Sequence, residues 1–279
     1  MKIRNFKQTT SKIMIYILIS VLATIVIFPI TWMLTISFRN NNEVFTFPPR
    51  FIPQNFNYDA YTRILQSNRY MRYFFNSYII SFAVTIFSVI IAIFTGYGFS
   101  RFNFKGNKLM NLFVIATQTV PGVVLVIPYF IFIIQLKLYD TYPGLILTFT
   151  SFTLPYAILM LTGYFNTIPK ALDEAVIIDG GSRFTALWRV IVPITIPGII
   201  STVIFTFILA WNEFLFALTL TKRDAMRTIP VGIAMLKGET AYEWNMMMAI
   251  SVLGSIPVLI LFLFAQKYFM PGLKAGGVK

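Results

Sequence analysis

Six long runs of apolar residues alternate with short polar segments along this chain. Each run exceeds the roughly 20 residues that a helix needs to cross the hydrocarbon core of a bilayer. The pattern predicts an all-α, polytopic membrane protein with six transmembrane helices in one domain, residues 1–279. The expected spans are residues 13–36, 74–100, 109–134, 144–165, 194–221 and 244–268.

The segment before the first run is basic and favours a cytoplasmic N-terminus. Its four cations are Lys2, Arg4, Lys7 and Lys12. The run itself is longer than the core of a signal peptide, so we expect it to be retained as a span. An even number of spans places both termini in the cytoplasm. Segments 101–108 and 166–193 then face the cytoplasm, while 37–73, 135–143 and 222–243 lie outside.

The composition also indicates that lipid, rather than water, surrounds most of the chain. Hydrophobic residues make up 57% of the chain and charged residues only 12%, too few to cover a surface that faces water. The net charge of +13 suggests nucleic-acid binding as an alternative. However, the basic residues fall between the apolar runs, as expected for cations that orient membrane helices.

Several classes of chemistry are excluded because the chain contains neither cysteine nor histidine. Disulfides, thiol nucleophiles, the usual zinc sites and histidine proton relays all need one of these residues. The ten acidic residues are scattered, so we expect no metal site. No G-x-x-x-x-G-K-[ST] phosphate loop occurs either, so we expect no enzyme and no bound cofactor in this chain.

Prolines interrupt several of the expected spans. They are Pro29, Pro121, Pro128, Pro155 and Pro257. A proline kinks a helix, and the carbonyl that it frees within a membrane needs neighbouring protein or water. Either the bundle bends around a pathway, or these are the ordinary kinks of a membrane protein.

The stretch from Ile168 to Pro197 predicts two short helices that project from the membrane. Pro169 favours a helix start, and Gly180 with Gly181 ends that helix about three turns later. Ser182 is suited to cap a second short helix, 183–191, which Pro193 ends. A short helix gains most of its stability by packing, so this hairpin implies a partner surface.

This stretch resembles the "EAA" coupling motif of binding-protein-dependent ABC importer permeases. The matching positions are Glu174, Ala175, Asp179, Gly180, Ile191, Pro193 and Pro197. Val176, Gly181, Trp188 and Val192 depart from the motif conservatively. Segments along nearly the whole chain also look like the carbohydrate-uptake branch, in its maltose-permease G-subunit-like members. They are FPITWMLTISFR, NFNY, NSYI, GYGFSRFNFKG, TQTVPGVVLVIPYF, WNEFLFAL and QKYFMPGL.

The resemblance implies a pore subunit of an importer in the bacterial cytoplasmic membrane. The implied partners are a second, non-identical permease subunit, a dimer of ATPase subunits that binds ATP–Mg, and an external sugar-binding protein. The ATPase would dock on the 166–193 loop. The expected coupling residues are Glu174, Ala175, Asp179, Gly180, Gly181 and Pro193. For Glu174, a solvated helix charge stays the alternative.

One carboxylate falls within an expected span. An ionisable residue at that depth marks a pathway or a partner. Trp211, Asn212 and Glu213 together offer an aromatic face, an amide and a carboxylate, a set suited to sugar. Gln118 is a weaker pathway candidate. Alternatively, Glu213 pairs with an Arg or Lys of a neighbouring helix.

Three functions compete at this point. An ABC importer permease, with a sugar or another solute as cargo, fits both the 166–193 loop and the absence of a phosphate-loop motif. An ion-coupled secondary transporter would need polar relays in several spans. A membrane enzyme would need clustered catalytic groups, which the sequence does not display. The sequence does not identify the sugar.

Overall fold

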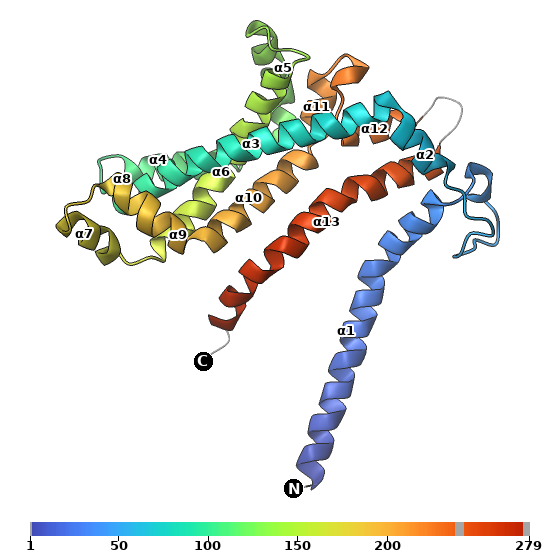
Figure 1. Cartoon of the computed structure of the whole chain (residues 1–279), viewed down its shortest axis with the longest axis horizontal. Coiled ribbons are helices and arrows are strands. Elements are labelled where there is room, and N and C mark those ends of the chain that lie inside the picture. Colours follow the sequence, from blue (N-terminus) through green and yellow to red (C-terminus); the bar gives the residue numbers. More distant parts are fainter. Residues whose placement is uncertain (1, 238–242, 276–279) are drawn as a thin grey trace. The chain divides into compact units, whose positions relative to one another are not determined.

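The computed structural model describes residues 2–237 and 243–275, with side chains from residue 12 to residue 268. Its regular elements are helices, which confirms the all-α prediction (Figure 1). Contacts between Cα atoms divide the chain into two compact units. One unit comprises residues 1–67 and 235–254, and the other comprises 68–234 and 255–279. That both belong to one permease domain stays a prediction.

The first unit contains α1 (Lys2–Ser37), a 3-10 turn (Asn41–Glu43), α2 (Asp59–Gln66) and the start of α13 (Trp244–Ala275). The Ser37 and Tyr61 hydroxyls are 2.7 Å apart, and Phe38 stacks on Tyr61. Arg63 pairs with Glu243 at 3.2 Å. The first two contacts join the end of α1 to α2, and the ion pair joins α2 to the residue that precedes α13.

The second unit is built on α3 (Asn68–Arg101), α6 (Tyr142–Asn166) and α10 (Ile196–Trp211), which pack against one another (Figure 1). Small residues let α3 and α6 approach closely. A Cβ at Gly96 would lie 3.1 Å from the backbone N of Thr162. The Ser88 and Thr153 hydroxyls are 2.8 Å apart and buried. Small and hydroxyl side chains are the usual contacts between helices in a membrane.

The remaining helices surround this core. They are α4 (Asn107–Thr117), α5 (Gly122–Gln135), α7 (Ala171–Ile178), α8 (Arg183–Ala186), α9 (Val192–Ile194), α11 (Leu215–Leu220) and α12 (Ile229–Met235). A π-helical turn, Leu187–Ile191, joins α8 to α9, and a 3-10 turn covers Asp224–Met226. Two apolar clusters form the core, one beside α5 and α11 and the other beside the 166–193 loop.

Four helical segments are long and apolar enough to cross a membrane: Lys12–Ser37, Asn68–Arg101, Tyr142–Asn166 and Trp244–Tyr268. They match four of the expected spans. The other two spans are not straight helices. Asn107–Thr117 and Gly122–Gln135 meet at 98°, and Arg183–Ile194 meets Ile196–Trp211 at 79°. The count reaches six if each bent pair is one span.

The first of these bends has a local cause. At Pro121 the chain lacks a backbone N–H, so the helix that ends at Thr117 cannot run on unbroken into α5. The run expected over 194–221 breaks after Trp211, and α11 restarts at Leu215.

The two ends of α3 contact different loops. Near its start, Asn76 Nδ2 donates to the carbonyls of Ala225 and Arg227 at 2.9 and 2.8 Å. At its end, Arg101 pairs with Asp173 of α7. A helix of 34 residues is about 51 Å long. Residues 225–227 of a segment expected outside and Asp173 of a segment expected inside therefore lie at opposite ends of one helix.

Candidate functional site

The 166–193 loop begins with a well-terminated helix. Leu172 N donates to the Pro169 carbonyl at 3.3 Å, so α7 starts at the expected place. At its other end, Gly180 N donates to the Ile177 carbonyl at 3.0 Å and Gly181 N to the Val176 carbonyl at 2.8 Å. This is a Schellman motif, which satisfies carbonyls that the helix leaves unpaired.

The two glycines serve this motif for different reasons. Gly180 has φ +82°, a left-handed conformation that glycine adopts without strain. A Cβ at Gly181 would lie 2.6 Å from Val176 Cγ1 and 2.8 Å from the Val176 carbonyl oxygen. Gly180 is therefore needed for its backbone angles, and Gly181 is needed for space.

The second half of the loop is anchored in the core. Ser182 Oγ accepts from Thr185 N at 3.1 Å, so the expected cap of α8 is present. Leu187 and Ile191 are buried in the apolar cluster beside the loop. Pro193 does not end the helix as expected. It occupies an early position of α9, where its missing N–H costs little, and the break comes at Thr195.

A buried ion pair joins α7 to the end of α3. Arg101 Nε donates to Asp173 Oδ2 at 2.8 Å, and the two side chains are 2% and 1% exposed. Tyr97 Oη donates to Asp173 Oδ1 at 2.6 Å. The rest of the Arg101 guanidinium donates to Ser100 Oγ and to the carbonyls of Phe165 and Ile168.

This network contains residues that sequence reasoning missed. They are Asp173 and Arg101, which lie in the expected cytoplasmic segments 166–193 and 101–108 without any motif that marks them. A buried charge pair is stable only when its remaining donors and acceptors are satisfied, and here they are. The network fixes the orientation of α7 relative to α3 and α6.

Most of the expected coupling residues are exposed. Glu174, Ala175, Asp179 and Gly180 are exposed, as is Pro193 further along, while Gly181 is partly buried. Their neighbour Ile178, which was not among the expected residues, is 84% exposed. Leu172 and Phe184 are also exposed. The hairpin thus presents a mixed apolar and acidic surface on a rigid base.

Glu213 lies in the break between α10 and α11. Its carboxylate accepts from Phe216 N through Oε1 and from Ala217 N through Oε2, each at 3.1 Å. Among the described residues, the carboxylate has no Arg or Lys partner and instead accepts from N–H groups that the helix leaves unpaired at the start of α11. This geometry points to a role in holding α11.

The other pathway candidates border the same region. Trp211 is buried, stacks on Phe207 and meets the edge of Tyr78 at 5.0 Å between ring centroids. Asn212 is exposed and donates to the Ile208 carbonyl at 3.0 Å. Gln118 follows α4 and donates to the Phe152 carbonyl at 3.4 Å. Their contact with a substrate stays a prediction.

Charged groups also bind two loops together at the far end of the unit. Asp140 accepts from the backbone N–H of Lys222 and Arg223 and from the Arg223 guanidinium. Burial alone would raise the pKa of Asp140, but these hydrogen bonds outweigh it and lower the pKa below its usual value. Burial is likewise outweighed at Asp224, whose pKa is lowered by donors that include Tyr73 and Arg69.

These features define a class. A helical membrane bundle with broken spans and an exposed, partly apolar helical hairpin has the form of a subunit of a membrane transporter. Residues 88–275 match the family described as "Binding-protein-dependent transport system inner membrane component", and the chain belongs to this family. It is therefore a multi-pass inner-membrane component of a transport system.

Relatives match over nearly the full length. The chain is 36% identical over 276 residues to the trehalose/maltose transport system permease protein MalG of Thermococcus litoralis, covering 98% of this chain and 99% of MalG. It is 34% identical over 264 residues to the sulfoquinovosyl glycerol transport system permease protein SmoH of Agrobacterium fabrum, covering 95% and 93%.

A solved structure confirms the fold. A chain of a bacterial ABC transporter that imports the acidic polysaccharide alginate superposes with a TM-score of 0.77 at 23% identity, covering 92% of this chain and 95% of that chain. The expected resemblance to ABC importer permeases of the carbohydrate branch is confirmed by these findings.

Proposed function

We propose that this chain forms half of the pore of an ATP-driven importer that moves a sugar or oligosaccharide into the cell. Full-length similarity to permeases named for trehalose/maltose and for sulfoquinovosyl glycerol supports a saccharide as cargo. An ABC permease for a solute other than a sugar is the alternative. Sugar-dependent ATP hydrolysis by the complex in liposomes distinguishes the two.

The observation that carries the coupling role is the exposed face of α7. The chain has no phosphate loop, so its energy comes from a separate ATPase dimer that holds ATP–Mg. Ile178 projects from the hairpin with 84% of its side chain exposed, and Glu174 and Asp179 are exposed near it. An apolar anchor beside carboxylates suits a docking cleft that has a hydrophobic floor and basic walls.

The buried side of α7 complements this surface. Asp173 is held by Arg101 and Tyr97, so a displacement of α7 moves the end of α3 with it. We infer that closure of the ATPase dimer reaches the spans through this ion pair. A substrate path beside Gln118 and Trp211–Glu213 would then lie on helices that respond to it.

Two further partners complete the proposed importer. One such chain does not enclose a pore, so we assign it a second, non-identical permease subunit. The family description makes transport dependent on a binding protein, which would dock outside. We place both termini in the cytoplasm. The grouping of loops at opposite ends of α3 supports this topology.

Replacing Ile178 with glutamate tests the docking role. Because Ile178 makes few contacts within the chain, Ile178→Glu should leave folding unchanged and abolish co-purification of the ATPase. Ile52→Glu is the matched control, since Ile52 is 70% exposed and lies in the segment expected outside. Normal ATPase capture by Ile178→Glu would refute docking on α7.

A second pair of variants tests the turn. Gly180→Asn should retain uptake, because asparagine tolerates the left-handed conformation better than most residues. Gly180→Leu should lose both uptake and ATPase binding, because leucine strains that turn and adds bulk to the docking face. Equal uptake by the two variants would contradict a role for this turn.

A further inference from the structure

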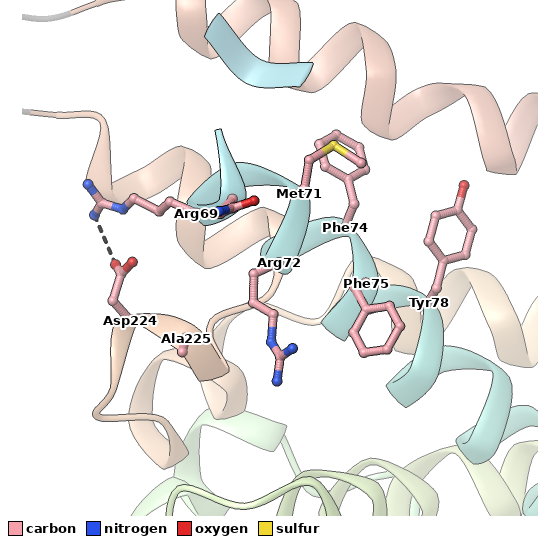
Figure 2. A pocket seen from close by; sticks show the side chains of 9 residues that line it. Arg69, Met71, Arg72, Phe74, Phe75, Tyr78, Asp224 and Ala225 are labelled. Atoms are coloured by element: carbon pink, nitrogen blue, oxygen red, sulfur yellow. Dashed lines mark hydrogen bonds and ion pairs between the residues drawn. The ribbon is translucent and has the colours of Figure 1, made fainter. Parts of the chain in front are cut away.

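A cleft of about 900 Å³ opens beside the first three turns of α3, at the end opposite the 166–193 loop. Its volume is within the range of small-molecule sites. Figure 2 shows Phe75 and Tyr78 projecting from α3, with Arg72 below them and the Arg69–Asp224 pair on the other side. The cleft thus has an aromatic side and a charged side.

The charged side has a surplus of positive charge. Asp224 Oδ1 accepts from three donors: Arg69 at 2.9 Å, Arg227 at 2.8 Å and Tyr73 at 2.7 Å. Two guanidinium groups therefore already share this one carboxylate. Arg72 adds a third cation to the same end of α3.

The N–H groups of Arg72 make no hydrogen bond or ion pair with the described residues. Arg72 is exposed, and its guanidinium carbon lies 5.4 Å from the centroid of the Phe75 ring. A guanidinium placed over a ring is held in position while its N–H groups stay available. A planar carboxylate matches such a fork with two parallel hydrogen bonds.

The aromatic side is also accessible. Phe75 is 51% exposed and Tyr78 is 37% exposed. Sugar rings pack their C–H faces on such surfaces. Tyr78 also contacts Trp211, a residue expected on the substrate pathway.

We propose that this cleft is a subsite for a saccharide that carries an acidic group. Arg72 binds the acidic group, and Phe75 and Tyr78 receive the sugar ring. Asp224 Oδ2, which accepts from no donor among the described residues, is placed to receive a hydroxyl. The proposal rests on the proposed function, since it assigns the charge class of the sugar to be imported.

The test compares two probes that differ only at C6: digalacturonate and the neutral galactobiose. Each is titrated into the importer complex, co-purified with its ATPase and held in phosphatidylcholine nanodiscs. The wild-type complex is expected to bind digalacturonate at least tenfold more tightly. Arg72→Gln is expected to remove this preference, a loss of about tenfold for one charge-assisted contact.

Alanine variants of two phenylalanines test whether binding depends on the cleft or on any exposed aromatic residue of α3. Phe75→Ala is expected to weaken both probes severalfold. Phe87→Ala is the matched control, since Phe87 is 53% exposed on the same helix and lies outside the cleft. Equal weakening by Phe87→Ala would overturn the assignment of the aromatic side.

Three other results would overturn the proposal: no binding of digalacturonate by the wild type, no preference for it over galactobiose, or a preference that survives in Arg72→Gln. Loss of digalacturonate binding in phosphatidylglycerol nanodiscs would instead make the cleft a lipid headgroup site. ATP hydrolysis that responds to a binding protein is measured on the same samples. Its absence would defeat the proposed function, whereas its presence without acid preference would defeat the subsite alone.

Discussion

Removal of Asp173 is expected to damage the protein far more than removal of its neighbour Glu174. Asp173→Ala leaves the Arg101 guanidinium without its counter-ion in a site where its side chain is 2% exposed. It also takes the acceptor from the Tyr97 hydroxyl. Glu174→Ala removes a charge of the same helix that faces solvent.

The expected magnitude follows from this burial. Breaking a buried ion pair by removing one partner costs about 3–5 kcal/mol. Three further acceptors of Arg101 stay in place, namely Ser100 Oγ and the carbonyls of Phe165 and Ile168, so we expect the lower half of that range. Glu174→Ala should change the free energy of unfolding by less than about 0.5 kcal/mol.

A double variant separates charge burial from the loss of contacts. Arg101→Met together with Asp173→Leu removes both charges and keeps apolar volume. Replacing a buried pair in this way is often close to neutral. The double variant should therefore regain most of the stability that Asp173→Ala loses.

The assay is reversible unfolding in mixed micelles, with hydrogen exchange of residues 171–178 as a local readout. A loss below about 1 kcal/mol in Asp173→Ala would refute the reasoning. So would a double variant as unstable as the single one. If the pair also transmits closure, the double variant should bind ATPase normally yet hydrolyse ATP without import.

Two further predictions concern the opposite end of the second unit and the break after α10. The pKa of Asp140 is lowered on folding, so its contribution to stability is complete above its unfolded pKa of about 4 and is lost as the pH falls further. The protection factors of the amides at 220–223 should thus fall only below about pH 4, and Asp140→Asn should abolish this pH dependence. Glu213→Ala should destabilise α11 by about 1 kcal/mol, the cost of losing a helix cap, whereas Glu213→Gln keeps an acceptor oxygen. Impaired transport in both variants, with normal exchange protection of α11, would favour substrate contact over capping.

Local signals in the sequence were enough to predict the hairpin at 166–193. Pro169, the Gly180–Gly181 pair and Ser182 act on backbone groups within a few residues of themselves, so their effects are visible in the sequence. The four straight spans are predicted equally well, because the length of an apolar run sets the length of the helix.

Contacts between distant segments could not be predicted in this way. Arg101 and Asp173 are separated by 72 positions, and nothing near either residue indicates the other. Pro121 and Gly122 predict an interruption of the helix, but the 98° bend between α4 and α5 depends on packing. There Phe216 of α11 approaches Gly122 and stacks on Phe152. Glu213 stands out in the sequence as a carboxylate within an expected span, but the N–H groups that bind it belong to α11, a separate helix that the continuous apolar run does not predict.

The length of α3 sets how far the bundle is free to rock in its bilayer. Arg72 and Arg101 stand 29 positions apart, which is about 44 Å along the axis, whereas the hydrocarbon core is about 30 Å thick. A helix of this length can tilt by up to about 45° before Arg72 and Arg101 can no longer both lie outside the hydrocarbon core. A swing of only about 5° about one end carries the other end about 4 Å sideways. Within this range of tilt, motion of α3 brings neither Arg72 nor Arg101 into the hydrocarbon core.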